Sequence, residues 1–255
     1  MEHVGIGGVQ LEVQRIAGDV ARAPMVFLHE GLGSVAMWRD WPATLCRATG
    51  RPGIVYSRRG YGGSDAVPDV RGAGRLKPDY MHREALEVLP ALLDKLELAH
   101  PILVGHSDGG TIALIHAAHL EALACVVMAP HVIVEDVSVS AIEQARVAYE
   151  KGDLRQRLAR FHADVDCAFW QWNDVWLSEA FREFDIRVDC RRIVSPVLAL
   201  QGANDPYGTL RQVDEIAPIK GRFVRTLLPD CGHSPHRDRP EETCHLITEF
   251  LQPLP

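Results

Sequence analysis

The stretch ILVGHSDGGTIALIHAA, residues 102–118, decides the fold of this chain. Its apolar residues run directly into Gly105, and Ser107 is the middle residue of the segment from Gly105 to Gly109. The residues that follow have the spacing of a helix that begins at once. We therefore predict a buried strand, a tight turn that carries the serine, and a helix, in that order.

The rest of the chain repeats this alternation of short apolar runs with helical patterns. The predicted strands are residues 10–16, 25–29, 53–56, 101–104, 124–128, 197–201 and 223–228, and the predicted helices are 38–48, 80–96, the segment after Ser107, and 240–251. Strands that are apolar along their whole length are typical of a parallel sheet covered on both faces. The order of strands and helices predicts an α/β fold with a doubly wound, mostly parallel sheet.

The alternation is interrupted between residues 131 and 195. That segment has no strand-like run, and its helical patterns are rich in charged and aromatic residues. Helices inserted between two strands of a sheet are most simply a cap over one edge of it. We therefore predict a core domain of residues 1–130 and 196–255 and a helical cap of residues 131–195.

The turn at Ser107 has the features of a catalytic nucleophile. GHSDG matches G-x-S-x-G between a predicted strand and a predicted helix, the context in which this motif holds a reactive serine. A strained backbone at the serine requires Gly105 and Gly109, because a Cβ atom there would collide with the adjoining strand and helix. The N–H of Asp108, at the positive end of the helix dipole, is the first predicted donor to an oxyanion.

A serine hydroxyl needs a base and an acid, and in this architecture they follow in the order serine, acid, histidine. Asp205 lies in QGANDPYG and His233 lies in PDCGHSPH, each just after a predicted strand. The carboxyl ends of the strands form the edge where open α/β sheets build their sites. We therefore predict Ser107, Asp205 and His233 as a catalytic triad.

Other histidines and acids remain alternatives. His236 lies three residues after the predicted base, and Glu135 and Asp136 follow an earlier strand. His29 and His106 are expected to support the serine turn and the loop facing it through hydrogen bonds. The two histidines of HSPH have the spacing of a metal pair, but no third ligand follows in pattern, so we predict no metal site.

The loop HEGLGS, residues 29–34, follows an early predicted strand. Its glycines let the backbone approach a substrate carbonyl, so the second oxyanion donor is expected to be the N–H of Gly31 or of Leu32. The alternative is an ordinary turn in which Gly33 only permits a positive φ. Glu30 is assigned to the substrate pocket. The loop lacks the third glycine of a dinucleotide fingerprint, and the chain has no Walker A pattern.

Composition argues against several other functions. The net charge is −7 and both signs are mixed along the chain, so no basic stripe is available to nucleic acid. The amino terminus has no signal-peptide pattern, and no apolar run reaches the roughly 20 residues that cross a bilayer. The six cysteines are scattered without a CxxC pair, which favours reduced thiols. We expect a soluble, cytoplasmic protein with neither nucleic-acid nor membrane partners, and leave open whether it forms a homo-oligomer.

Five motifs resemble those of one family. LHEGLGS, RRGYGGSD, VGHSDGG, GANDP and GHSPH, between residues 28 and 236, look like the successive motifs of the α/β-hydrolase family. The resemblance implies Ser107 as nucleophile, Asp205 as orienting acid and His233 as base. These are the same residues that the topology selects.

The chain departs from the family pattern at two places. Many members have HG directly after the strand, whereas here Glu30 separates His29 from Gly31. Many also have an aspartate before RG, where this chain has Ser57 and Arg58. The first departure leaves the second oxyanion donor open, and the second removes a local Asp–Arg pair.

The triad and the resemblance together predict a serine hydrolase. We expect it to cleave a small to medium carboxylic ester or lactone through an acyl-enzyme intermediate, without a metal or an organic cofactor. One alternative is a hydrolase of carbon–carbon bonds in ring-fission products of aromatic compounds, because the same triad serves that reaction. The other is a hydrolase-like ligand receptor without turnover.

The predicted cap contains an aromatic cluster. Phe169, Trp172 and Trp176 fall at spacings of three and four and share one helix face. This face either packs the cap onto the core domain or roofs an apolar cleft above Ser107. In the second case Trp172 and Trp176 line the substrate pocket and favour aromatic or medium aliphatic acyl groups.

Overall fold

An eight-stranded sheet forms the centre of the chain in the computed structural model, which describes all 255 residues. Its strand order is β1-β2-β4-β3-β5-β6-β7-β8. The strands are β1 (Glu2–Ile6), β2 (Val9–Ile16), β3 (Met25–Leu28), β4 (Gly53–Tyr56), β5 (Ile102–His106), β6 (Ala124–Met128), β7 (Val197–Gly202) and β8 (Phe223–Leu228). Neighbouring strands from β4 to β8 are parallel. Strand β2 is antiparallel to both of its neighbours, β1 and β4. The predicted mostly parallel α/β sheet is thus confirmed.

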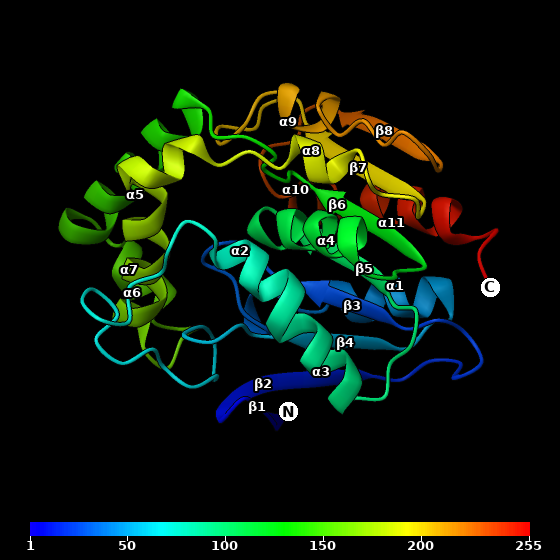
Figure 1. Cartoon of the computed structure of the whole chain (residues 1–255), viewed down its shortest axis with the longest axis horizontal. Coiled ribbons are helices and arrows are strands. Elements are labelled where there is room, and N and C mark those ends of the chain that lie inside the picture. Colours follow the sequence, from blue (N-terminus) through cyan, green and yellow to red (C-terminus); the bar gives the residue numbers. More distant parts are fainter.

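Helices cover both faces of this sheet (Figure 1). On one face lie α2 (Tyr80–Arg83), α3 (Leu89–Lys95), α4 (Asp108–His119) and α8 (Arg187–Cys190), and on the other α1 (Trp41–Thr49), α10 (Pro235–Asp238) and α11 (Pro240–Leu251). Short helical turns at Ala36–Trp38 and at α9 (Arg211–Asp214) complete the core. The sheet is therefore the middle of three layers.

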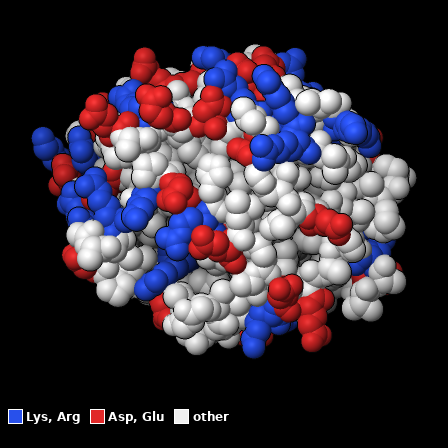
Figure 2. All heavy atoms as spheres, viewed as in Figure 1, with Lys and Arg blue, Asp and Glu red and all other residues white.

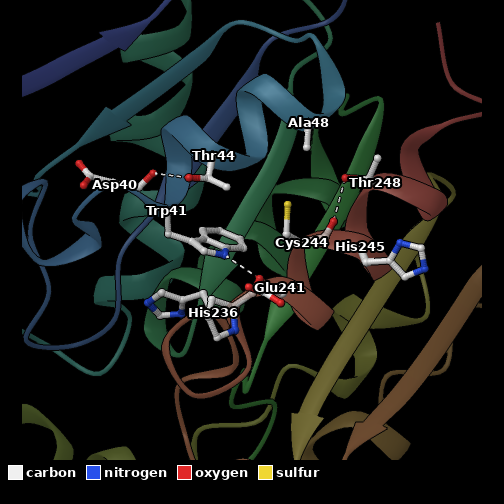
Figure 3. A pocket seen from close by; sticks show the side chains of 10 residues that line it. Asp40, Trp41, Thr44, Ala48, His236, Glu241, Cys244, His245 and Thr248 are labelled. Carbon is white, nitrogen blue, oxygen red and sulfur yellow. Dashed lines mark hydrogen bonds between the residues drawn. The ribbon is translucent and has the colours of Figure 1, made fainter.

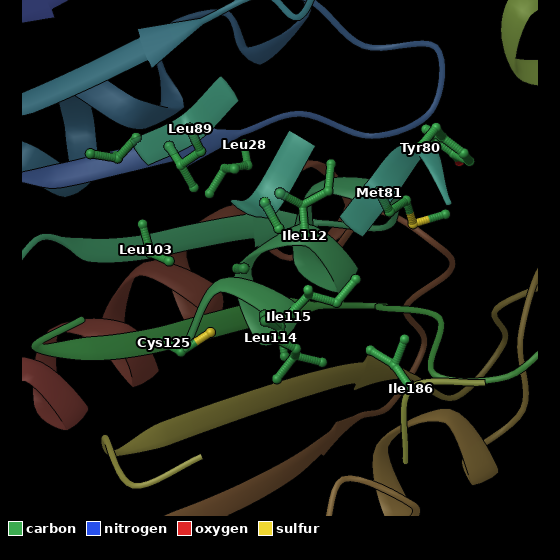
Figure 4. Close-up of a cluster of buried hydrophobic side chains, with 14 of the residues drawn as sticks. Leu28, Tyr80, Met81, Leu89, Leu103, Ile112, Leu114, Ile115, Cys125 and Ile186 are labelled. Atoms are coloured by element: carbon green, nitrogen blue, oxygen red, sulfur yellow. The ribbon is translucent and has the colours of Figure 1, made fainter. Parts of the chain in front are cut away.

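Strand β5 shows how the sequence sorts side chains between the two layers. Leu103 belongs with Leu89 and Ile112 to the cluster on the α4 face (Figure 4). Ile102 and Val104 belong to the other cluster, beneath α1 and α11. Successive side chains of a strand point to opposite faces, so a strand with helices on both sides must be apolar throughout. This is why Ile102, Leu103 and Val104, which precede the serine turn, are all apolar.

The helix predicted over residues 80–96 is present but interrupted. A π-helical turn at Glu84–Val88 separates α2 from α3. Pro90 stands at the start of α3. Proline has no backbone N–H and its ring clashes with the carbonyl four residues earlier, which accounts for a break in the regular hydrogen bonding at this point.

The segment between β6 and β7 is helical. It contains α5 (Asp136–Lys151), α6 (Leu154–Leu158), α7 (Val165–Trp176), a 3₁₀ turn at Glu179–Glu183, and α8. Helices α5, α6 and α7 gather at one end of the sheet (Figure 1), whereas α8 packs against α4. The predicted limits of the cap, residues 131 and 195, remain a prediction.

Charged side chains of both signs are interspersed over the visible surface (Figure 2). This agrees with the mixed charge pattern of the sequence. None of the helices combines the length and the apolar character that crossing a bilayer requires.

Candidate active site

Ser107 lies in a strained turn between β5 and α4. Its backbone has φ 53° and ψ −121°, a positive φ that residues with a side chain rarely adopt. A Cβ atom on Gly105 would lie 2.2 Å from the carbonyl oxygen of Gly109, and one on Gly109 would lie 2.0 Å from that of Leu28. Both glycines are therefore sterically required, as the sequence predicted.

Asp205 and His233 form a close pair although 28 residues separate them. The His233 Nδ1 lies 2.9 Å from both carboxylate oxygens of Asp205. Because a carboxylate only accepts, Nδ1 carries the hydrogen, and the Nε2 of the neutral ring is left with a lone pair. A ring in this tautomer can take a proton from a hydroxyl group.

Further donors fix the Asp205 carboxylate. Gln201 Nε2 and the backbone N–H of Tyr207 each donate to it at 2.8 Å. Burial alone would raise the pKa of Asp205, but the hydrogen bond and charge of His233 outweigh it and hold this pKa below its usual value. Asp205 therefore remains ionised beside the imidazole.

Two other histidines hold the surrounding loops, as expected. His106 Nε2 donates to the backbone carbonyl of His233 at 2.7 Å. His29 Nδ1 donates to the carbonyl of Glu30 at 2.7 Å, and its Nε2 accepts from the N–H of Arg58 at 3.0 Å. These contacts connect the serine turn, the loop after β3 and the loop after β8.

The loop after β3 leaves two backbone donors free. The N–H groups of Gly31 and Leu32 donate to no protein acceptor. Above this loop, a Cβ atom on Gly31 would lie 2.1 Å from the Nε1 of Trp172, so the indole requires glycine there. His162, from the segment between α6 and α7, donates to the Leu32 carbonyl at 3.0 Å. Either N–H is available to a ligand oxygen, and the choice between them stays open.

Arg58 lacks the local aspartate partner, as expected, but contacts groups of other segments. Its guanidinium donates to the carbonyls of His29 at 2.7 Å and Glu30 at 3.0 Å. It also lies 3.9 Å from the carboxylate of Asp108. The Arg58 guanidinium therefore pairs with an aspartate of the serine turn, in a distant part of the chain.

Glu30 contacts His106 and Gly33, and its place in the substrate pocket remains a prediction. Its carboxylate lies 3.4 Å from His106 Nδ1 and folds back over Gly33. Burial would raise the pKa of Glu30, but the hydrogen bond and charge of His106 outweigh it and lower this pKa strongly. Since Glu30 follows a buried strand, its sequence position predicts its neighbourhood but not the direction of its side chain.

The two predicted pocket tryptophans lie beside the site. Trp172 contacts the loop at Gly31, as described above, and is 6% exposed. Trp176 is 1% exposed, and its ring centroid lies 4.9 Å from that of His131. The His131 ring in turn lies 5.9 Å from that of His233. Helix α7 thus brings aromatic side chains against both the loop after β3 and the neighbourhood of His233.

Comparisons with known proteins agree with this geometry. A family model described as the alpha/beta hydrolase family matches residues 25–246. The chain belongs to this family. The hydrolase is 25% identical over 279 residues to the sn-1-specific diacylglycerol lipase ABHD11 of Mus musculus, covering 98% of this chain and 88% of that protein.

Other relatives extend the comparison. The hydrolase is 24% identical over 284 residues to a proline iminopeptidase of Levilactobacillus brevis, covering 93% of this chain and 91% of the relative. The solved structure of the enol-lactonase from Burkholderia xenovorans LB400 superposes with a TM-score of 0.73 at 21% identity, covering 98% and 99% of the two chains. The predicted family and the prediction that the chain is an α/β-fold hydrolase are confirmed.

His236 makes no hydrogen bond to Asp205, the predicted acid. Its ring packs 4.7 Å from Trp38 and 5.5 Å from Trp41, and it lines a groove of about 570 Å³ between α1 and α11 (Figure 3). Burial lowers its pKa well below the usual value. No group of three His, Cys, Asp or Glu side chains is arranged to hold a metal ion. Of the two neighbouring histidines, His233 is the one that pairs with Asp205.

The rival acids have other partners. Glu135 accepts from the backbone and hydroxyl of Thr209 and from Gln212 Nε2. Asp136 pairs with Arg182 at 3.0 Å. Neither carboxylate has a hydrogen bond to a histidine.

Sequence reasoning missed three residues that the fold brings to the site: Arg58, Tyr80 and His162. Tyr80 donates its hydroxyl hydrogen to the Asp108 carboxylate at 2.6 Å. Arg58 carried a signal, because it stands in the motif RRGYGGSD. Tyr80 and His162 had none, since their contacts depend on how distant segments pack.

Proposed function

We propose that this hydrolase is a serine hydrolase that cleaves a small to medium carboxylic ester or lactone through an acyl-enzyme intermediate. The observation that carries the proposal is the pair of 2.9 Å contacts between His233 Nδ1 and Asp205, at the same sheet edge as a serine in the strained turn. Names of the relatives agree with this chemistry, since a lipase and an enol-lactonase are among them.

The mechanism follows from the roles of these groups. Ser107 Oγ attacks the substrate carbonyl carbon while His233 Nε2 takes the hydroxyl proton. The same ring then gives that proton to the departing oxygen, and the acyl group remains on Ser107. Water, deprotonated by His233, attacks the acyl carbon, and the proton returns to Ser107 as the acid leaves. Asp205 orients the ring and stabilises its charged form.

The oxyanion formed in both steps needs donors. Asp108 is the first residue of α4, so its N–H has no acceptor within the helix. We assign it as one donor and the N–H of Gly31 or Leu32 as the other. We assign Glu30 a contact with His106, at 3.4 Å from its Nδ1.

The acyl pocket is assigned to the cap side of Ser107. Trp172 and Trp176 are buried there beside Gly31 and His131. Their apolar faces suit an aromatic or medium aliphatic acyl group better than a charged one. These contacts favour an ester or lactone of such an acid as substrate.

The test is a turnover screen with p-nitrophenyl esters of increasing chain length, lactones and aromatic ring-fission products. We expect hydrolysis of esters or lactones, and covalent labelling by a fluorophosphonate in the wild type but not in Ser107→Ala. Turnover of ring-fission products alone would assign carbon–carbon hydrolysis instead. Ligand binding with no turnover would indicate a receptor.

A further inference from the structure

Tyr80 connects the cap to the serine turn through two hydrogen bonds. Its hydroxyl lies 3.0 Å from the indole Nε1 of Trp176 and 2.6 Å from an Asp108 carboxylate oxygen. An indole N–H can only donate, so the Tyr80 oxygen accepts from Trp176 and its single hydrogen points to Asp108. The three residues lie on α2, α4 and α7, and together we call them the strap.

The strap is buried throughout its length. Tyr80 is 8% exposed, Trp176 is 1% exposed and Asp108 is fully buried. Bonds to a carboxylate in such surroundings are strong and short, because no water competes for the acceptor. Each member is therefore held in one position as long as the other two are in place.

The end of the strap is the residue assigned as oxyanion donor. The Asp108 side chain is fixed by Tyr80 on one oxygen, with Arg58 at 3.9 Å from the same oxygen. The other oxygen, Oδ1, has no partner. Tyr80 is thus the one hydroxyl group that anchors this carboxylate, and through it the orientation of the Asp108 peptide at the start of α4.

We propose that Tyr80 is a positioning residue for the reaction, because the strap fixes the Asp108 N–H in the geometry that stabilises the oxyanion while the cap is seated. The inference rests on the proposed function and concerns the same site. The Tyr80 hydroxyl makes no hydrogen bond to a triad residue. Tyr80 acts through Asp108, and the hydrogen bond from Trp176 links Tyr80 to α7.

A purely structural role predicts something different. The Tyr80 ring packs 5.9 Å from that of Phe181, so the residue also fills space between α2 and the cap. Tyr80→Phe keeps this packing and removes only the hydroxyl group. Any effect of that change on catalysis beyond its effect on stability must come from the hydrogen bonds.

The chain offers a matched control in Tyr149. This tyrosine is also buried, and its hydroxyl also donates to an aspartate, Asp166, at 2.5 Å. It belongs to α5 and stacks on Phe169 within the cap. Tyr149→Phe therefore removes a buried tyrosine hydroxyl that donates to an aspartate, without touching the strap; Asp166 itself is half-exposed and also pairs with Arg155.

The experiment measures kcat, KM and the affinity for a trifluoromethyl ketone that copies the acyl part of the best ester. The Ser107 hydroxyl adds to the carbonyl of such a ketone, and the oxyanion that forms contacts the oxyanion donors. The affinity for the ketone therefore measures transition-state binding. We expect Tyr80→Phe to lower kcat and ketone affinity together by about 10- to 100-fold, somewhat less than removing an oxyanion donor outright. KM should stay within about twofold, as expected when only transition-state contacts are lost.

Tyr149→Phe should leave all three quantities within about twofold of the wild type, and the melting temperatures of both variants are measured beside the kinetics. Trp176→Phe, which removes the other bond of the strap and also alters the acyl pocket, should lower kcat and ketone affinity together by a smaller factor, whatever its effect on KM. This second variant keeps the test decisive if Tyr80→Phe does not fold.

Equal kcat values for Tyr80→Phe and Tyr149→Phe, or a change confined to KM, would overturn the role of Tyr80 while Ser107-dependent hydrolysis stands. A wild type without Ser107-dependent hydrolysis would instead remove the proposed function, and the inference with it. The two failures are therefore distinguishable in one set of measurements.

Discussion

Ser107 is held in a backbone conformation that costs free energy. A non-glycine residue at positive φ is destabilised by about 1–3 kcal/mol unless its surroundings impose that state. Here the surroundings do so, because Gly105 and Gly109 allow the strand and the helix to approach more closely than any side chain would permit. This strained conformation is the one expected of a serine nucleophile in the G-x-S-x-G motif.

The two histidines of GHSPH should differ in their effect on catalysis. His233→Ala removes the base and is expected to lower kcat by about 10⁴-fold or more. His236→Ala leaves Asp205 and the base in place and should cost far less activity, although it loosens the packing against Trp38. Kinetics of both variants with the best ester check this. The reverse order, or inactivation by a chelator, would point to a metal site.

His131 should make the hydrolase sensitive to acid. Burial, together with the nearby His233, lowers its pKa from 6.5 to about 3. Between those values the unfolded chain binds a proton at this residue and the native chain does not, so the free energy of unfolding falls as the pH drops below 6.5. Between pH 6.5 and pH 5, the proton that only the unfolded chain binds at His131 lowers the free energy of unfolding by about 2 kcal/mol.

The measurement is urea unfolding of the wild type and His131→Gln at pH 7 and pH 5. The variant should lose about 2 kcal/mol less than the wild type between these conditions. His245→Gln, at an exposed histidine, is the control and should behave as the wild type. Equal losses in all three proteins would show that His131 does not carry this sensitivity.

Helix α7 packs against α5 and also contacts the loop after β3, and its sequence does not show which aromatic residue makes which contact. Phe169 is fully buried and stacks on Tyr149 at 3.6 Å, inside the cap. Trp172, one turn later, faces Gly31 of the loop after β3. The aromatic face therefore contacts α5 at one end and the loop after β3 at the other, and both interpretations of it remain predictions.

Substitutions on α7 separate these interpretations. Phe169→Ala should lower the free energy of unfolding by about 3–5 kcal/mol, as for a large core side chain, and leave acyl selectivity unchanged. Trp172→Ala should in addition change the ratio of kcat/KM between short and bulky acyl groups by about tenfold. Thermal melts and kinetics with two esters check both. If the two variants share the same selectivity, the aromatic face belongs to the core and Trp172 does not line the pocket.

Over the whole molecule, the sheet could be predicted because its strands are local signals. An uninterrupted apolar run is visible within four to six residues, as at Gly53–Tyr56 and Ala124–Met128. Strand β1 was missed, since the segment Glu2–Ile6 is mostly exposed and is a strand only because it pairs with β2. The break at Glu84–Val88 was also missed, because periodicity ignores the missing N–H of Pro90.

The site was predictable where topology or a motif constrains it. The pairing of Asp205 with His233 follows from two strand ends at the same sheet edge. The contacts of Tyr80 with Asp108 and Trp176 were not predictable, because they depend on how α2 and the cap pack in three dimensions. The contact of Glu30 with His106 was not predictable for the same reason.

The account as a whole depends on an acyl group passing through Ser107. The most direct measurement mixes the wild-type hydrolase with p-nitrophenyl acetate, stops the reaction with acid in the steady state, and maps the modified peptide by mass spectrometry. We predict one acetyl group on Ser107, and none on that peptide in Ser107→Ala. Ester hydrolysis without an acylated Ser107, or acylation of another side chain, would contradict the account.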